Sequence, residues 1–139
     1  MTMTNVGVLP VSTFAGEMIR RVEPDADLWD VADRLVEADV GAMVVGDDRD
    51  IKGVVSERDL VRALAARRDL GTTTAMDIAQ TRLVWCDANS SVAEVATEMM
   101  EHYVRHVLIE DEGRFVGVVS ARDLLSAYAA AEVTNADVA

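Results

Sequence analysis

The sequence predicts a mixed α/β (α+β) protein of 139 residues, made of two copies of one β-α-β-β-α unit. The segment that begins at Gly53 and ends at Ala66 recurs from Gly117 to Ala130, with ten identical positions. The same order of apolar stripes and short β-branched runs lies upstream of both segments, and similarity at a fixed offset marks an internal repeat. Because each unit alone is too small to bury its apolar strands, we expect them to pack sheet to sheet with pseudo-two-fold symmetry.

Each copy begins with a less regular lead segment. Short helices are expected at residues 14–19 and 74–79, and short strands at residues 20–23 and 82–85. We expect the register between the two copies to slip by one residue within this segment.

Apolar residues then recur with the i, i+3, i+4, i+7, i+8 spacing of an amphipathic helix. The first set is Leu28, Val31, Ala32, Leu35 and Val36, and the second, at the same offset as the repeated segment, is Val92, Val95, Ala96, Met99 and Met100. Acidic residues precede or occupy the first turn of each helix, which suits the positive end of the helix dipole. We therefore expect both stripes to face the core.

Two short strands joined by a polar turn follow in each copy. They are expected at residues 42–45 and 51–55, and again at residues 107–109 and 115–119, because β-branched runs separated by an Asp/Gly cluster indicate a hairpin. A second helix starts at Ser56 and at Ser120 and continues through Ala- and Leu-rich sequence. The expected domains are residues 10–68 and 74–131, with residues 1–9 and 132–139 as flexible tails.

The composition limits the classes of molecule that the protein is expected to bind. The chain has 25 acidic and 13 basic residues, a net charge of −12, which argues against binding to nucleic acid or to an anionic membrane surface. The sequence has neither the pattern of a signal peptide nor an apolar run of about 18 residues, so we expect a cytoplasmic protein with no membrane span. Cys86 and two distant histidines lack the spacing of metal ligands, so no metal site is expected.

The duplicated strand-to-helix junction reads Gly-Val-Val-Ser-x-Arg-Asp-Leu. This motif and the order of elements resemble the CBS domain family, in which a tandem pair is called a Bateman module. The resemblance covers about residues 10–130. It implies two clefts that accept an adenosine-containing ligand such as AMP, ADP, ATP, NAD or S-adenosylmethionine. It also implies a homodimer and an unidentified protein that the module regulates.

The resemblance assigns roles to individual residues. In the family the motif aspartate holds the ribose hydroxyls and the motif serine reaches the sugar or phosphate, while backbone groups of the lead segments meet the adenine edge. Lead-segment candidates are residues 20–22 and 82–84. The candidate ligand-binding residues are Arg20, Val22, Ser56, Arg58, Asp59, Val84, Arg105, His106, Ser120, Arg122 and Asp123.

The Ser-x-x-Asp pairs also have a purely structural interpretation. A serine N-cap with an acid three residues later approximates a capping box, in which the serine contributes about 1 kcal/mol. Arg58 and Arg122 lie in the first helical turn, where a cation opposes the dipole. They are therefore candidates for pairing with a phosphate. The alternative is a solvated arginine, or one bridged to a nearby carboxylate.

The two copies differ just before the first strand of the hairpin. Arg105-His106 replaces Gly41-Ala42, and basic residues at this place in CBS domains often face ligand phosphates. We therefore expect two unequal clefts. The alternative is an exposed arginine followed by an ordinary strand histidine.

Catalytic patterns are absent from the sequence. We find no P-loop, nucleophile elbow or Rossmann glycine pattern, assign no catalytic residue and expect no enzyme. The main hypothesis is a regulatory module that senses an adenine nucleotide. The alternative is a CBS-fold protein that has lost nucleotide binding and acts by dimerisation or docking. Trp29, which lies off the apolar stripe, and the Ala-rich last helix are candidate dimer contacts.

Overall fold

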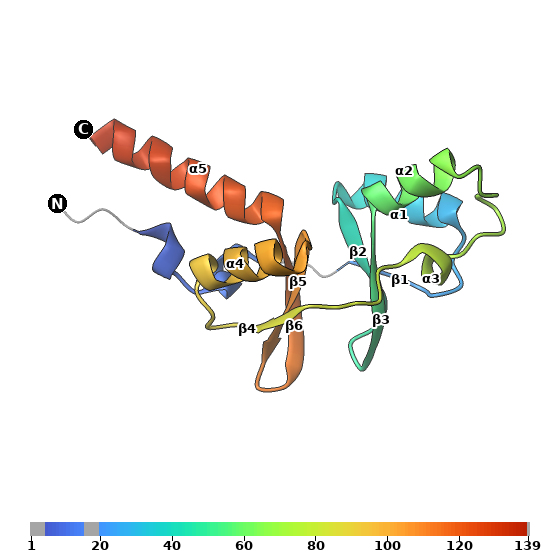
Figure 1. Ribbon diagram of the computed structural model, residues 1–139, viewed down its shortest axis with the longest axis horizontal. Helices are drawn as coiled ribbons and strands as arrows, with labels where there is room; N and C mark the ends of the chain where they lie inside the picture. Colours follow the sequence, from blue (N-terminus) through green and yellow to red (C-terminus); the bar gives the residue numbers. More distant parts are fainter. Residues whose placement is uncertain (1–4, 16–19, 139) are drawn as a thin grey trace. The chain divides into compact units, whose positions relative to one another are not determined.

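The computed structural model describes residues 5–15 and 20–138, with side chains up to residue 131. It contains two three-stranded sheets of the same topology (Figure 1). In each sheet a short strand runs parallel to the middle strand, which pairs antiparallel with the third. The predicted mixed α/β class and the repeated β-α-β-β-α order are therefore confirmed. No helix in these described ranges is long and apolar enough to cross a membrane.

One compact unit is formed by residues 20–83. Its elements are β1 (Arg21–Val22), α1 (Leu28–Ala38), β2 (Ala42–Asp47), β3 (Asp50–Ser56), α2 (Glu57–Ala65) and α3 (Ala75–Ile78). The core lies between the sheet and the two longer helices, with Val31, Val45 and Val55 fully buried.

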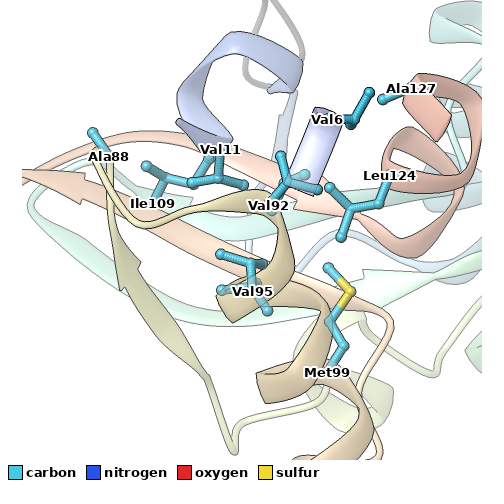
Figure 2. Packing of buried hydrophobic residues seen from close by; sticks show 11 residues of the cluster. Val6, Val11, Ala88, Val92, Val95, Met99, Ile109, Leu124 and Ala127 are labelled. Carbon is cyan, nitrogen blue, oxygen red and sulfur yellow. The ribbon is translucent and has the colours of Figure 1, made fainter. Parts of the chain in front are cut away.

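The other compact unit combines residues 5–15 with residues 84–138. Its elements are η1 (Val6–Val8), η2 (Val11–Phe14), β4 (Trp85–Asp87), α4 (Val92–His102), β5 (His106–Asp111), β6 (Arg114–Ser120) and α5 (Ala121–Val138). Val6 and Val11 pack against residues of α4, β5 and α5 (Figure 2). Val6, expected in a tail, thus belongs to the core, and α5 continues past residue 131.

The lead segments pack crosswise. Residues 75–80 precede the second copy in the chain, yet they lie against β3 of the first copy. The Val54 N–H donates to the Gln80 carbonyl at 3.0 Å, and the Gln80 N–H donates to the Val54 carbonyl at 2.8 Å. This pairing satisfies backbone groups on the outer edge of β3 that would otherwise need water. The expected helix at residues 74–79 is confirmed as α3, whereas residues 16–19 of the other lead segment lie outside the described part.

The lead strands of the two copies are separated by the same number of residues as Gly53 and Gly117. The expected slip in register between the copies is therefore wrong. Arg21 pairs with Val44, and Trp85 pairs with Leu108, which is one repeat later in both strands. The second lead strand therefore begins at Trp85 and not at residue 82. Backbone pairing to the middle strand fixes this register, and the irregular lead sequence does not reveal it.

The amphipathic helices confirm most of the predicted stripe and correct its last position. Asp27 and Ser91 cap α1 and α4 by accepting a backbone N–H three residues on, at 2.9 and 3.1 Å. The fifth stripe residues, Val36 and Met100, are 80% and 77% exposed. At about 100° per residue, position i+8 lies about 80° from position i, at the edge of the buried face. Met100 is therefore not a core residue.

Both predicted hairpins are confirmed, although their turns differ. In the second copy Glu112 and Gly113 join the strands with φ values of 51° and 79°, as a two-residue hairpin turn requires. The register shifts at equivalent places in both hairpins, after Val45 and after Ile109, and in the first copy Gly46 has a φ of 109° there. A Cβ on Gly46 would lie 2.3 Å from the Asp50 carbonyl oxygen, so only glycine fits at this bulge.

Candidate functional site

The first strand-to-helix junction is a complete capping box, as the sequence predicts. Ser56 ends β3, and its hydroxyl accepts a hydrogen bond from the Asp59 N–H at 3.3 Å. The Ser56 N–H and hydroxyl donate to Asp59 Oδ2 at 2.8 and 2.9 Å. Asp59 is only 5% exposed, and a buried carboxylate must find hydrogen-bond donors. The local sequence alone thus provides donors for one of its two oxygens.

The other oxygen of Asp59 is held by a residue that sequence reasoning missed. Gln80 Nε2 donates to Asp59 Oδ1 at 3.0 Å. Gln80 comes from the lead segment of the second copy, so only the crosswise packing brings it to this junction. One signal was available: at the repeat offset, the first copy has Gly16 in the place of Gln80, so the two copies differ at this position.

The second junction repeats the cap without that additional donor. The Ser120 N–H donates to Asp123 Oδ2 at 2.9 Å, and the Asp123 N–H donates to Ser120 Oγ at 3.0 Å. Asp123 is half-buried. Within the described ranges, no side chain is found to donate to its second carboxylate oxygen.

The structure brings Arg105 and His106 to the second junction. The Ala121 N–H at the start of α5 donates to the Arg105 carbonyl at 2.8 Å, and His106 lies opposite Ser120 in the β5–β6 ladder. Arg105 is exposed and His106 is half-buried. Gly41 and Ala42 occupy the matching places beside Ser56, where the Glu57 N–H donates to the Gly41 carbonyl at 2.9 Å. The difference in charge between the copies therefore falls directly at the junctions.

Arg58 and Arg122 occupy the first turns of α2 and α5, and both side chains are exposed. Neither forms an ion pair with a carboxylate in the part of the chain that the structure describes. The exposed side chains agree with the alternative of a solvated arginine, and pairing with a phosphate stays a prediction.

The lead residues are tied to the middle strand of each sheet. The Arg20 carbonyl accepts the Val44 N–H at 3.0 Å, and the Val84 carbonyl accepts the Leu108 N–H at 2.9 Å. Arg20 and Val84 are thus equivalent positions. Val22, in contrast, is 1% exposed and packs in the core. Its side chain serves packing, and only its backbone remains a candidate for ligand contact.

Cys86, on β4, is a half-buried thiol. Burial is the main cause that raises its pKa to about 11, and nearby Asp87, Glu98 and Glu110 add to the effect. Among the side chains that the structure describes, in residues 5–15 and 20–131, no three of His, Cys, Asp or Glu gather as a metal ion would require.

Alkylation of Cys86 should report this raised pKa. Because the thiolate is the reactive form, iodoacetamide at pH 8 should modify the native protein about 100-fold more slowly than the urea-unfolded protein. The native rate should keep rising as the pH approaches 11, whereas the unfolded rate should level off above pH 9. The chain has one cysteine, so mass spectrometry reads a single site. Native and unfolded profiles with the same midpoint would contradict the assigned environment.

Family comparison matches most of the chain to one domain model. The CBS domain model matches twice, at residues 11–66 and 75–130. Hypoxic response protein 1 of Mycobacterium tuberculosis is 40% identical over 90 residues. This match covers 63% of each protein, so the chain spans just under two thirds of that relative's length.

Two solved structures are similar over most of both chains. The CBS domain protein PAE2072 from Pyrobaculum aerophilum, complexed with AMP, has a TM-score of 0.73 and 32% identity, and the match covers 83% of this chain and 89% of that one. Hypoxic Response Protein I, solved with two coordinated zinc ions, has a TM-score of 0.68 and 32% identity, with coverage of 84% and 97%.

Proposed function

Because the chain belongs to the CBS domain family, we propose that it is a regulatory module that binds an adenosine-containing ligand at its Ser-x-x-Asp junctions. The observation that carries the proposal is the carboxylate of Asp123. Its Oδ2 is fixed by the cap, while its second oxygen has no side-chain donor among the described residues. The pair of hydroxyls on a ribose supplies the donors that such an oxygen accepts.

The charge around this junction suits a phosphorylated ligand. Three basic residues belong to this junction of an otherwise acidic protein. Arg122 lies between Ser120 and Asp123 in the sequence, His106 pairs with Ser120 in the β5–β6 ladder, and the Arg105 carbonyl accepts a hydrogen bond from the start of α5. Guanidinium groups bind phosphate oxygens with two parallel hydrogen bonds. AMP, whose complex with a similar CBS protein is known, is therefore the first ligand to test, followed by ADP, ATP, NAD and S-adenosylmethionine.

A second function is supported by the exposed apolar side chains of the helices. In the unit of residues 20–83, Trp29 is 59% exposed and Val36 is 80% exposed, and in the other unit Leu125 is 70% exposed. Exposed apolar side chains that lie singly are common on protein surfaces, and in this second function an interface would cover these. Here the protein would act as a homodimer or by docking on a regulated protein. Light scattering that gives the monomer mass at micromolar concentration would contradict the homodimer.

Thermal unfolding separates the two functions. A ligand present at 100 times its dissociation constant stabilises the folded state by about 2.7 kcal/mol, which for a chain of this size raises Tm by roughly 10 °C. We expect AMP or another adenosine compound to produce this shift, with guanosine monophosphate as the control. If no adenosine compound shifts Tm or binds below millimolar concentration in calorimetry, the nucleotide proposal is wrong and the interaction function remains.

A further inference from the structure

The Asp59 carboxylate is fully engaged by the protein itself. The cap donates two hydrogen bonds to Oδ2, and the Gln80 amide donates one to Oδ1 at 3.0 Å. Asp59 is 5% exposed, while Gln80 is itself exposed to solvent. The cap leaves Oδ1 of the buried Asp59 carboxylate without a donor, and the solvent-exposed side chain of Gln80 supplies one.

The second junction has the same cap and no such contact. Asp123 keeps the hydrogen bonds to Ser120, yet it is half-buried and its other oxygen receives no side-chain donor within the described ranges. The residue that corresponds to Gln80 in the other copy is Gly16, which has no side-chain amide. The two junctions thus differ in whether a protein amide already occupies the acceptor.

We propose that Gln80 sets the difference in ligand affinity between the two junctions. This inference rests on the proposed function, in which a ribose donates to the motif aspartate. At Asp59 a ribose hydroxyl must first displace the Gln80 amide, so one protein hydrogen bond breaks for each one that the ligand forms. At Asp123 the ligand meets an open acceptor. The Asp123 junction therefore fills first, and Gln80 restrains binding at Asp59.

Calorimetry with AMP tests the inference in a background with one junction disabled. In Asp123→Asn the remaining binding reports the Asp59 junction. Adding Gln80→Ala to this variant should tighten that binding about tenfold, which is the effect of one hydrogen bond. Adding Gln80→Ala to Asp59→Asn should leave the affinity of the Asp123 junction unchanged.

Three results would overturn the inference while the proposed function stands. Wild-type protein could bind two equivalents of AMP with equal affinity. Gln80→Ala could leave binding at the Asp59 junction unchanged. It could also weaken that binding, which would make Gln80 a direct ligand contact. If neither the wild-type protein nor any variant binds an adenosine compound, the proposed function itself fails and takes the inference with it.

A measurement without ligand checks the contact on which the inference depends. The side-chain amide signal of Gln80 in a 15N spectrum is identified by its loss in Gln80→Ala. It should shift more in Asp59→Asn than in Asp77→Asn, since the Asp59 carboxylate accepts from the Gln80 amide itself whereas the Asp77 carboxylate accepts from the Thr74 N–H. If the Gln80 signal does not shift in Asp59→Asn, the inference is wrong, whatever the nucleotide measurements show.

Discussion

Replacing Asp123 with asparagine should weaken AMP binding at the second junction about 10- to 100-fold. Asparagine keeps the size of the side chain and one acceptor oxygen for the Ser120 N–H, so the cap survives in part. It removes the negative charge and the second oxygen that the ribose would use. Hydrogen bonds to a charged group contribute about 1.5–3 kcal/mol, and each 1.4 kcal/mol is about a tenfold change in affinity. Titration calorimetry measures the change directly.

Asp77→Asn is the matched control for this substitution. Asp77 forms a capping box of the same kind, in which the Thr74 N–H donates to its carboxylate at 2.9 Å and its own N–H donates to Thr74 Oγ1 at 3.2 Å. The hydrogen bonds from Thr74 hold the pKa of Asp77 below its usual value. Asp77 lies on α3 in the unit of residues 20–83, whereas Asp123 belongs to the other unit, so the loss of Asp77 should leave AMP affinity at the Asp123 junction unchanged. An equal loss of affinity in both variants would mean that Asp123 acts only through helix capping.

Replacing Gly53 with alanine should destabilise the unit of residues 20–83 by about 1–3 kcal/mol, the usual range for overpacking. A Cβ at this position would lie 2.8 Å from the Gln80 carbonyl oxygen and 3.1 Å from the Ala79 Cβ. The nearer atom belongs to the backbone, so residues 79–80 must move. That movement strains the paired hydrogen bonds between Val54 and Gln80. Urea unfolding followed by circular dichroism measures the loss.

Gly117→Ala gives the comparison at the equivalent position of the second copy. Among the described residues, the nearest neighbour of its added Cβ would be the Ala15 Cβ at 3.4 Å, which is close to an ordinary contact. Alanine also restricts the unfolded chain more than glycine does, a gain of about 0.5–1 kcal/mol where the backbone is compatible. We therefore expect Gly117→Ala to be neutral within about 1 kcal/mol. If both variants lose the same stability, the close approach of residues 79–80 to β3 is not the cause.

Elements with strong local patterns were predictable. The helices α1 and α4 follow from their apolar spacing, and the hairpins follow from β-branched runs around polar turns. The Ser56 and Ser120 caps follow from one serine and one acid at the correct spacing. Each of these features depends on residues within a few positions of one another, so the sequence contains all the information they need.

The local pattern was misleading where burial depends on distant neighbours. The spacing placed Met100 on the buried stripe, but the partners of α4 leave this position exposed. The first residues resembled a tail, but Val6 fills a place beside α4 and α5. The residues within α4 and within the N-terminal segment do not indicate which other elements each will pack against.

The candidate site likewise has features that the sequence predicts and features that only the fold reveals. The repeat, the two Ser-x-x-Asp junctions and the contrast between Arg105-His106 and Gly41-Ala42 could all be predicted, because each depends only on residue identity at a constant offset. Only the tertiary structure placed residues 75–80 beside β3, and with them the Gln80 amide on Asp59. The side chains of Asp59 and Gln80 are 21 positions apart, so their hydrogen bond depends on the path by which the chain comes back to the edge of the sheet. Local residue spacing does not predict that path.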